Sequence, residues 1–151
     1  MRLTSPSSLS LFLLAATGPG AALADNFVSS CDAGSVKVSG RILTASCRNI
    51  LGQLQCSRLD LSRCIKNTYG SLQADPNASG PSFGDQCIEC SNGETTEGLL
   101  LGGGTTLMHC KCNPGTGAAQ SSWPTAFIDL NTLVDNINGV LGCYKVQGSP
   151  C

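Results

Sequence analysis

The chain has 151 residues, of which only 13% are charged, and its formal net charge is −1 at pH 7. This balance provides no basic surface for nucleic acid or for an anionic membrane. Ten cysteines beside one Trp, two Tyr and four Phe favour a small domain in an oxidising compartment, in which up to five disulfides supplement a modest core.

Residues 1–24 have the pattern of a secretory signal peptide. Arg2 gives it a positive start, residues 9–17 (LSLFLLAAT) are apolar, and Ala22-Leu23-Ala24 is a small-x-small cleavage site. The apolar run is too short to span a bilayer. We therefore expect a secreted, extracellular protein whose mature part, residues 25–151, is a single domain.

The mature sequence contains short strand-like pieces and few helical ones. Residues 35–43 (SVKVSGRIL) alternate between apolar and polar side chains, and Gly and Pro interrupt the chain every few positions. Apolar residues at i, i+3 and i+4 occur in short pieces such as residues 129–137 (DLNTLVDNI), which fit a single 3-10 turn. The sequence predicts a mostly β protein.

One pattern occurs twice in the chain. Residues 58–72 (RLDLSRCIKNTYGSL) and 127–141 (FIDLNTLVDNINGVL) share an apolar-Asp-Leu opening and then an aliphatic residue, an Asn, a Gly and a Leu at equal offsets. A Phe followed four residues later by a Cys precedes each copy. The repeats span residues 27–73 and 83–144, and they predict two structural units related by a pseudo-twofold axis.

The repeated aspartates and glycines are predicted to shape a turn. Asp60 and Asp129 can accept backbone N–H groups and cap that turn. Gly70 and Gly139 stand where the chain needs a positive φ. The apolar positions of the repeat that we expect to be buried are Leu59, Leu61, Ile65, Leu72, Ile128, Leu130, Val134 and Leu141.

Residues 74–82 (ADPNASGPS) are predicted to form a linker between the repeats, because they contain two prolines, a glycine and small polar residues. The linker contains the N-glycosylation sequon Asn77-Ala78-Ser79, which requires surface exposure. Such triplets also arise by chance. Two interpretations therefore stay open: a glycosylated Asn77 and an unused triplet.

The sequence offers little support for catalysis or for a metal. Residues 87–90 (CIEC) and 109–112 (HCKC) together resemble half of a zinc site, and CIEC also resembles a redox pair, but a secreted chain favours disulfides over both. His109 is the only histidine, and no Ser-His-Asp triad is recognisable. Residues 102–106 (GGGTT) lack the Gly-Lys-Ser/Thr ending of a P-loop and predict a flexible hairpin loop. We predict no enzymatic activity, no cofactor and no metal.

The ordered set of motifs resembles the cyanovirin-N homology family. The set comprises F-x-x-x-C twice, ILTASC, LDLSRCIKN-x-x-G-x-L and IDLNTLVDNINGVL, and it covers the chain from Phe27 to about Cys143. The resemblance implies a β fold of two pseudo-symmetric halves, each a three-stranded sheet plus a β-hairpin, with strands exchanged between the repeats. It also implies a filamentous fungus as the commonest source, and a monomer or a dimer swapped through the central hinge.

The family's two sugar pockets imply two sets of residues in this chain. The first residue group is Asn26, Ser29, Ser30, Arg48, Asn49, Asn136 and Asn138. The second residue group is Lys66, Asn67, Tyr69, Asp85, Gln86 and Asn113. For Asn67 and Asn136 two interpretations stay open, because an amide can stabilise a turn or bind a sugar hydroxyl.

This chain departs from the family pattern at both groups. Arg48 and Ile50 stand where members often have a carboxylate or hydroxyl, Lys66 replaces an acid, and Tyr69 replaces a small acidic residue. Tyr69 could stack on a pyranose ring or fill the pocket. Asn138 is a milder change that keeps an acceptor, so the first residue group is the stronger candidate.

The resemblance implies the disulfides Cys31–Cys47 and Cys87–Cys112. The other six cysteines allow 15 pairings. We predict Cys90–Cys110 because this pair lies just inside Cys87–Cys112 in an antiparallel hairpin. Cys56–Cys64 and Cys143–Cys151 then follow as local links.

Two functional hypotheses follow. The first is a non-enzymatic lectin that binds mannose-rich glycans or glycoproteins, with no nucleic-acid partner and no membrane insertion. The second is a disulfide-rich secreted interaction or effector protein that kept the scaffold and lost sugar binding, which Arg48, Ile50 and Lys66 favour. A small hydrolase would require turnover that depends on His109 or a carboxylate.

Overall fold

The computed structural model describes residues 26–93 and 105–151. The predicted signal peptide lies outside the described residues, as do residues 102–104 of the predicted hairpin loop. Within the described ranges, no helix is long and apolar enough to cross a lipid bilayer.

The described residues form mostly β structure with short helical turns. The strands are β1 (Lys37–Ser39), β2 (Ile42–Arg48), β3 (Leu54–Asp60), β4 (Ile65–Thr68), β5 (Ser71–Ala74), β6 (Cys87–Asn92), β7 (Leu107–Cys112), β8 (Thr125–Asp129), β9 (Asp135–Ile137), β10 (Val140–Cys143), β11 (Val146–Gln147) and β12 (Ser149–Pro150). The one α-helix in these residues is α1 (Phe83–Gln86), and the 3-10 turns are η1 (Phe27–Ser29), η2 (Ala33–Ser35), η3 (Leu61–Arg63), η4 (Gln120–Ser122) and η5 (Leu130–Thr132).

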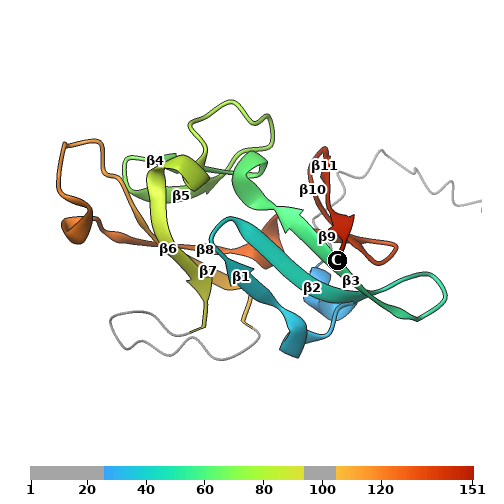
Figure 1. Cartoon of the computed structure of the whole chain (residues 1–151). Helices are drawn as coiled ribbons and strands as arrows, with labels where there is room; N and C mark the ends of the chain where they lie inside the picture. Colours follow the sequence, from blue (N-terminus) through green and yellow to red (C-terminus); the bar gives the residue numbers. More distant parts are fainter. Residues whose placement is uncertain (1–25, 94–104) are drawn as a thin grey trace, which may run out of the picture.

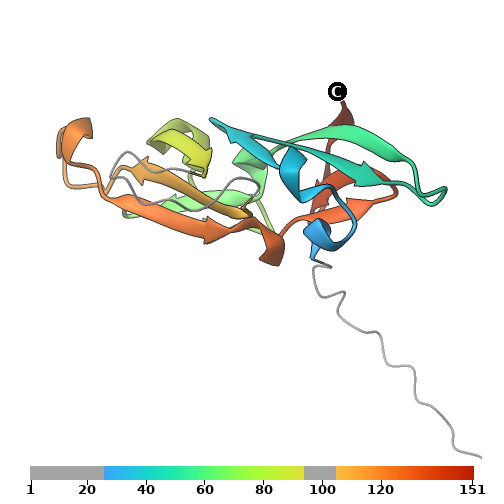
Figure 2. The ribbon, with the colours of Figure 1, turned by 90° about the horizontal axis from the view of Figure 1, so that it is seen from below.

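Two three-stranded antiparallel sheets form the body of the molecule. The first repeat supplies β1, β2 and β3, and the second supplies β6, β7 and β8. The two sheets meet edge to edge where Ser39 pairs with Ser91, and the C-terminal strand β12 pairs with β3 at the outer edge. Together they form one seven-stranded sheet with the order β12-β3-β2-β1-β6-β7-β8. The molecule is elongated as a result, with one sheet toward each end (Figures 1 and 2).

Each sheet is accompanied by a hairpin from the other repeat. The β9–β10 hairpin lies beside β3, where the backbone N–H of Leu141 donates to Ser57 Oγ at 2.9 Å. The β4–β5 hairpin packs near β8 (Figure 1). We call β1–β3 with β9–β10 the first half, and β6–β8 with β4–β5 the second half. The predicted mostly β fold with exchanged strands is confirmed.

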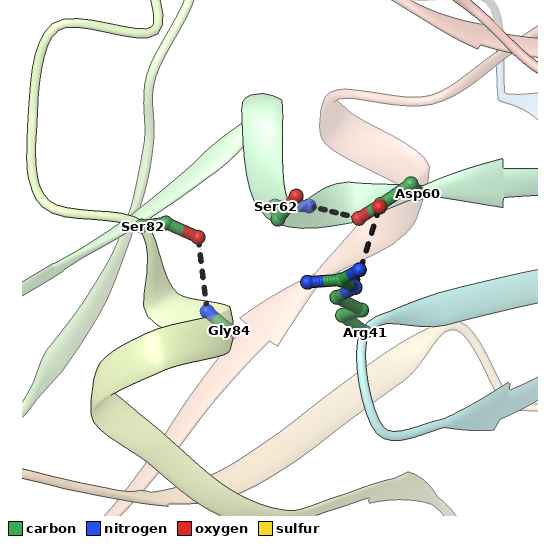
Figure 3. Close-up of polar contacts among 5 residues, drawn as sticks. All are labelled: Arg41, Asp60, Ser62, Ser82 and Gly84. Atoms are coloured by element: carbon green, nitrogen blue, oxygen red, sulfur yellow. Dashed lines mark hydrogen bonds and ion pairs between the residues drawn. The ribbon is translucent and has the colours of Figure 1, made fainter.

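The duplicated pattern forms the same capped turn in both repeats. The Asp60 carboxylate accepts a hydrogen bond from the backbone N–H of Ser62, and Asp129 accepts one from Asn131, each at 3.0 Å. Figure 3 shows the first cap, in which Asp60 also pairs with Arg41 at 3.3 Å. The prediction that both aspartates are structural caps is confirmed.

The repeated glycines end hairpin turns, as predicted. Gly70 and Gly139 both have φ of 86°. A Cβ at Gly70 would come within 2.9 Å of Pro124 Cγ. Both the left-handed backbone and the close approach of the neighbouring loop therefore require glycine at this turn.

The core runs along the inner faces of both halves. In β2, the alternate residues Leu43, Ala45 and Cys47 are buried, as the period of a half-buried strand requires. Phe27 and Phe83 are both fully buried at equivalent points of the two repeats. The residues predicted to be buried are so, with Ile128 only partly covered: Leu59, Leu61, Ile65, Leu72, Leu130, Val134 and Leu141.

All ten cysteines form disulfides. Cys31–Cys47, Cys87–Cys112 and Cys90–Cys110 pair as predicted. The predicted pairs Cys56–Cys64 and Cys143–Cys151 are wrong. The structure instead has two bonds that join the repeats, Cys56–Cys151 and Cys64–Cys143.

Strand geometry explains the error. Cys56 lies in β3, and the extended residues from Cys56 to Asp60 alone span about 13 Å, well beyond the ~7 Å between Cα atoms that a disulfide tolerates. The C-terminal strand β12 pairs with β3, with Pro150 opposite Ser57, and so brings Cys151 beside Cys56. Two cysteines near in sequence were thus separated by a strand, and two far apart were joined by sheet pairing.

The linker is a structured turn organised by a buried carboxylate. Asp75 is 3% exposed, and its side chain accepts hydrogen bonds from the Gly80 N–H at 2.8 Å and from Ser79 Oγ at 3.2 Å. These hydrogen bonds, the one from Gly80 first, hold the pKa of Asp75 below its usual value. Asn77 is exposed at this turn, as a glycosylated sequon would require, and both interpretations of the sequon stay open.

Candidate functional site

A pocket of about 380 Å³ lies in the second half, between the β4–β5 hairpin, the linker and the loop after β7. We call it the second-half pocket. Five members of the second residue group line it, namely Lys66, Asn67, Tyr69, Gln86 and Asn113. The sixth, Asp85, is exposed on α1 and is not among the lining residues. The fold thus gathers into one concavity residues that lie in three separate stretches of sequence.

Asn67 holds this pocket together. Its side chain is 3% exposed. Its Nδ2 donates to Gln86 Oε1 at 3.1 Å and to the Asn113 backbone oxygen at 2.8 Å, while its Oδ1 accepts from the Gly70 N–H at 3.0 Å. Both amide hydrogens are therefore used inside the protein. Of the two interpretations left open by the sequence, this geometry supports the structural one.

Asn136 makes the corresponding contacts in the first half. Its Nδ2 donates to Ser30 Oγ at 3.0 Å and to the Arg48 backbone oxygen at 2.9 Å, and its Oδ1 accepts from the Gly139 N–H at 2.8 Å. In both halves, an Asn before the hairpin turn ties that turn to two segments of the other repeat. The two asparagines are pseudo-symmetric structural centres.

The other members of the first residue group also use their polar side-chain atoms in hydrogen bonds within the protein, or they lie at the surface. Asn49 Oδ1 accepts from the backbone N–H groups of residues 51 and 53, at 3.0 and 2.9 Å. Asn138 Oδ1 accepts from the backbone of residue 50 at 2.7 Å. Asn26 and Ser29 are exposed at η1. These contacts use the side-chain oxygens of Asn49 and Asn138 within the first half.

The residues at the edge of the second-half pocket differ strongly from those around Asn136 in the first half. Tyr69 and Asn138 occupy equivalent positions with φ of 50° and 54°. Tyr69 is 82% exposed beside the second-half pocket. Beside Asn138, the hairpin tip between β2 and β3 instead presents the apolar side chains of Ile50 and Leu51, 84% and 75% exposed. The halves share their structural centre and differ in what they present to a ligand.

Sequence reasoning missed part of the second-half pocket. Gly80 and Pro81, from the linker, line it together with Thr68. The linker reaches the pocket because Lys66 forms a β-bridge with Ser82 and the Pro81 backbone oxygen accepts from Asn67 N–H at 3.2 Å. The sequence predicts only a linker between the repeats, and the pairing of this linker with β4 identifies it as a wall of the pocket.

The alternatives involving metal or redox chemistry gain no support from the structure. The cysteines of the CIEC and HCKC segments are in disulfides, so they offer no thiolate to a metal. Among the described residues, no three His, Cys, Asp or Glu side chains form a group that could hold a metal. His109 is buried with Nε2 3.2 Å from Ser91 Oγ, and burial lowers its pKa.

Comparison with known proteins agrees with this architecture. Residues 27–143 match the model of the CVNH domain family. The solved structure of GzCVNH from Gibberella zeae is 24% identical, covers 79% of this chain and 97% of that chain, and has a TM-score of 0.58. A microvirin:mannobiose complex is also 24% identical, covers 79% and 98%, and has a TM-score of 0.56. A MoCVNH3 variant in complex with (N-GlcNAc)4 is 19% identical, covers 80% and 98%, and has a TM-score of 0.59.

No protein of curated function shows significant sequence similarity to this chain. The family match nevertheless spans both repeats and ends at Cys143, before β11 and β12. The family is one of lectins, generally without catalytic activity. The fold, the two pseudo-symmetric halves and the family match agree, and the chain belongs to the cyanovirin-N homology (CVNH) family.

Proposed function

We propose that this protein is a secreted lectin that binds mannose-rich glycans at the second-half pocket, without chemical turnover. The observation that carries this proposal is the construction of the pocket. A concavity of about 380 Å³ combines an aromatic ring at its mouth with amide groups on a wall made rigid by Asn67. Such a combination of apolar surface and a few fixed polar groups is typical of small-ligand sites.

Tyr69 is suited to stack on a pyranose ring. Its ring lies against Gly115, where an added Cβ would come within 3.2 Å of Tyr69 Cδ1. The backbone beneath the ring therefore restricts how it can move. A flat, exposed ring held at the mouth of a pocket can cover the apolar face of a sugar, while amides such as those of Gln86 and Asn113 can bind its hydroxyl groups.

Two relatives support the choice of ligand class. The structures of microvirin and of the MoCVNH3 variant contain mannobiose and (N-GlcNAc)4, respectively. The five disulfides support an extracellular location, because such bonds persist in oxidising compartments. The sequence favours the first residue group; we place the binding site in the second half because five members of the second residue group line one pocket and an exposed Tyr69 stands at its mouth.

A titration of ¹⁵N-labelled protein with mannobiose tests the proposal. We expect chemical-shift changes at Tyr69, Gln86 and Gly115, and loss of binding in Tyr69→Ala. Tyr144→Ala is the matched control, because Tyr144 is also exposed, at 44%, has a positive φ of 53° and does not line the pocket. Shifts confined to the surroundings of Asn136, or none at millimolar sugar, would contradict the proposal.

A second function has a specific observation in its favour. Ile50, Leu51 and Leu54 are 84%, 75% and 51% exposed on one hairpin, which is an unusual display of large aliphatic side chains. This surface supports the alternative of a secreted interaction protein that has lost sugar binding. A protein partner captured from extracellular fractions in the presence of excess mannan, and released by Ile50→Ser with Leu51→Ser, would favour this alternative. Elution by mannan would count against it.

A further inference from the structure

The second-half pocket has one charged residue among those that line it, and that residue is a cation. Lys66, on β4, shares the wall with amide, hydroxyl and backbone groups, and the lining contains no Asp or Glu. Lys66 is half-buried. A charge in a partly dehydrated concavity interacts more strongly with a ligand than the same charge on an open surface.

The side chain of Lys66 is held by the linker. A Cβ built on Gly80 would come within 2.5 Å of Lys66 Cδ and 3.0 Å of its Cβ, so the linker backbone packs directly on the aliphatic stem. The β-bridge between Lys66 and Ser82 fixes the backbone on the same side. Because the stem is confined between strand and linker, binding a ligand costs less side-chain entropy than it would for a free surface lysine.

The Lys66 ammonium has no ion-pair partner in the part of the chain that the structure describes. The ion pairs there are Arg41–Asp60 and Lys111–Glu89. The charge of Lys66 contributes slightly to lowering the pKa of Asp75, so the two groups interact through space, but no ion-pair contact joins them. The pocket therefore has a positive charge that no carboxylate neutralises by direct contact.

We propose that the second-half pocket prefers a pyranose that carries an anionic substituent, such as phosphate, sulfate or carboxylate, over the same sugar without it. This inference rests on the proposed glycan site and specifies its ligand. Tyr69 would cover the ring, and Lys66 would pair with the anionic group. A hydrogen bond between charged groups contributes more free energy to binding than one between neutral groups, and the difference makes binding about tenfold tighter. The preference should weaken as ionic strength rises.

Matched pairs of sugars test the preference on the full mature protein. Mannose 6-phosphate is compared with mannose, and methyl glucuronide with methyl glucoside, by NMR titration at low and at physiological ionic strength. Inorganic phosphate alone is a third probe. The variants are Lys66→Gln, Lys66→Arg to retain the charge, and Lys37→Gln as an exposed strand lysine of the first half.

We expect the anionic member of each pair to bind about tenfold tighter, and the ratio to fall to near one in Lys66→Gln but to persist in Lys66→Arg and Lys37→Gln. Equal binding of both members, or a preference that survives in Lys66→Gln, would overturn the inference and leave the glycan site standing. Inorganic phosphate that binds as tightly as the phosphorylated sugar would also overturn it. Absence of binding by every sugar would overturn the inference together with the proposed function.

Discussion

Removing the Cys56–Cys151 disulfide should cost less stability than its span in sequence suggests. This bond and Cys64–Cys143 have sequence separations of 95 and 79, and the second is nested inside the first. With the inner bond intact, the outer bond closes a ring that contains only the residues between Cys56 and Cys64 and between Cys143 and Cys151, about 16 in number.

The loop-entropy relation gives the magnitude. A ring of about 16 residues contributes about 3 kcal/mol. Without the inner bond, the ring is shortened only by Cys87–Cys112, to about 70 residues, and contributes about 4.5 kcal/mol. Cys56 and Cys151 are both exposed, so replacing them by Ser leaves no cavity and buries no hydroxyl. The double variant Cys56→Ser with Cys151→Ser should therefore lose about 3 kcal/mol, and the same change in a Cys64→Ala, Cys143→Ala background should lose about 4.5 kcal/mol.

Urea unfolding of the oxidised proteins, followed by the fluorescence of Trp123, measures both losses, with the remaining disulfides mapped by mass spectrometry. The informative quantity is the difference between the two backgrounds, because strain and denatured-state effects that are common to both cancel. An equal loss in the two backgrounds would show that the bonds do not act as nested constraints. A loss of about 4.5 kcal/mol with the inner bond present would refute the reasoning in the same way.

The remaining predictions concern dimer assembly, the hydrogen bonds of Asn67, the hairpin turn at Gly70 and the pH dependence of stability. A dimer swapped through the linker would make both bonds between the repeats intermolecular, so an oxidised dimer should resist SDS without reductant, and a non-covalent swapped dimer would contradict this pairing. Asn67→Ala removes three hydrogen bonds and should lower the free energy of unfolding by about 2–4 kcal/mol in urea titrations. Gly70→Ala should cost more than about 1 kcal/mol through its φ and its contact with Pro124, and more than Gly40→Ala, where φ is also positive but the space is open. Burial lowers the pKa of His109, so the unfolded chain binds more protons and stability should fall as the pH drops below 6.5; His109→Gln should remove this slope.

The parts of the fold that could be predicted from the sequence are those that depend on a short local motif or on the duplicated pattern. An Asp before a turn and a Gly at its end carry the same physical requirement wherever they occur, so Asp60 and Gly70 were assigned without knowledge of the sheet. The repeat then transferred these assignments to Asp129 and Gly139. The buried positions followed from the same duplicated pattern, because both copies face a core.

The parts that sequence missed depend on which distant segments meet. Nothing in the residues around Cys56 indicates that a terminal strand will pair with β3 and bring Cys151 beside it. The same holds for Gly80 and Pro81, whose place in the pocket wall follows from the pairing of the linker with β4. Asn67 was ambiguous for a related reason, since an amide in isolation fits a turn or a ligand equally well, and its partners decide the role.

The pseudo-symmetry of the molecule separates what the fold needs from what a ligand would need. Because Asn67 and Asn136 make equivalent internal hydrogen bonds, their presence in both halves is explained by the fold and is no evidence of binding. Ligand-related chemistry must then lie where the halves differ, and one such difference is at the turn, with an exposed Tyr69 in one half and Asn138 in the other. The first half thus serves as an internal control: exchanging these two residues should weaken sugar binding in the second half while both Asn centres, and hence the fold, remain intact.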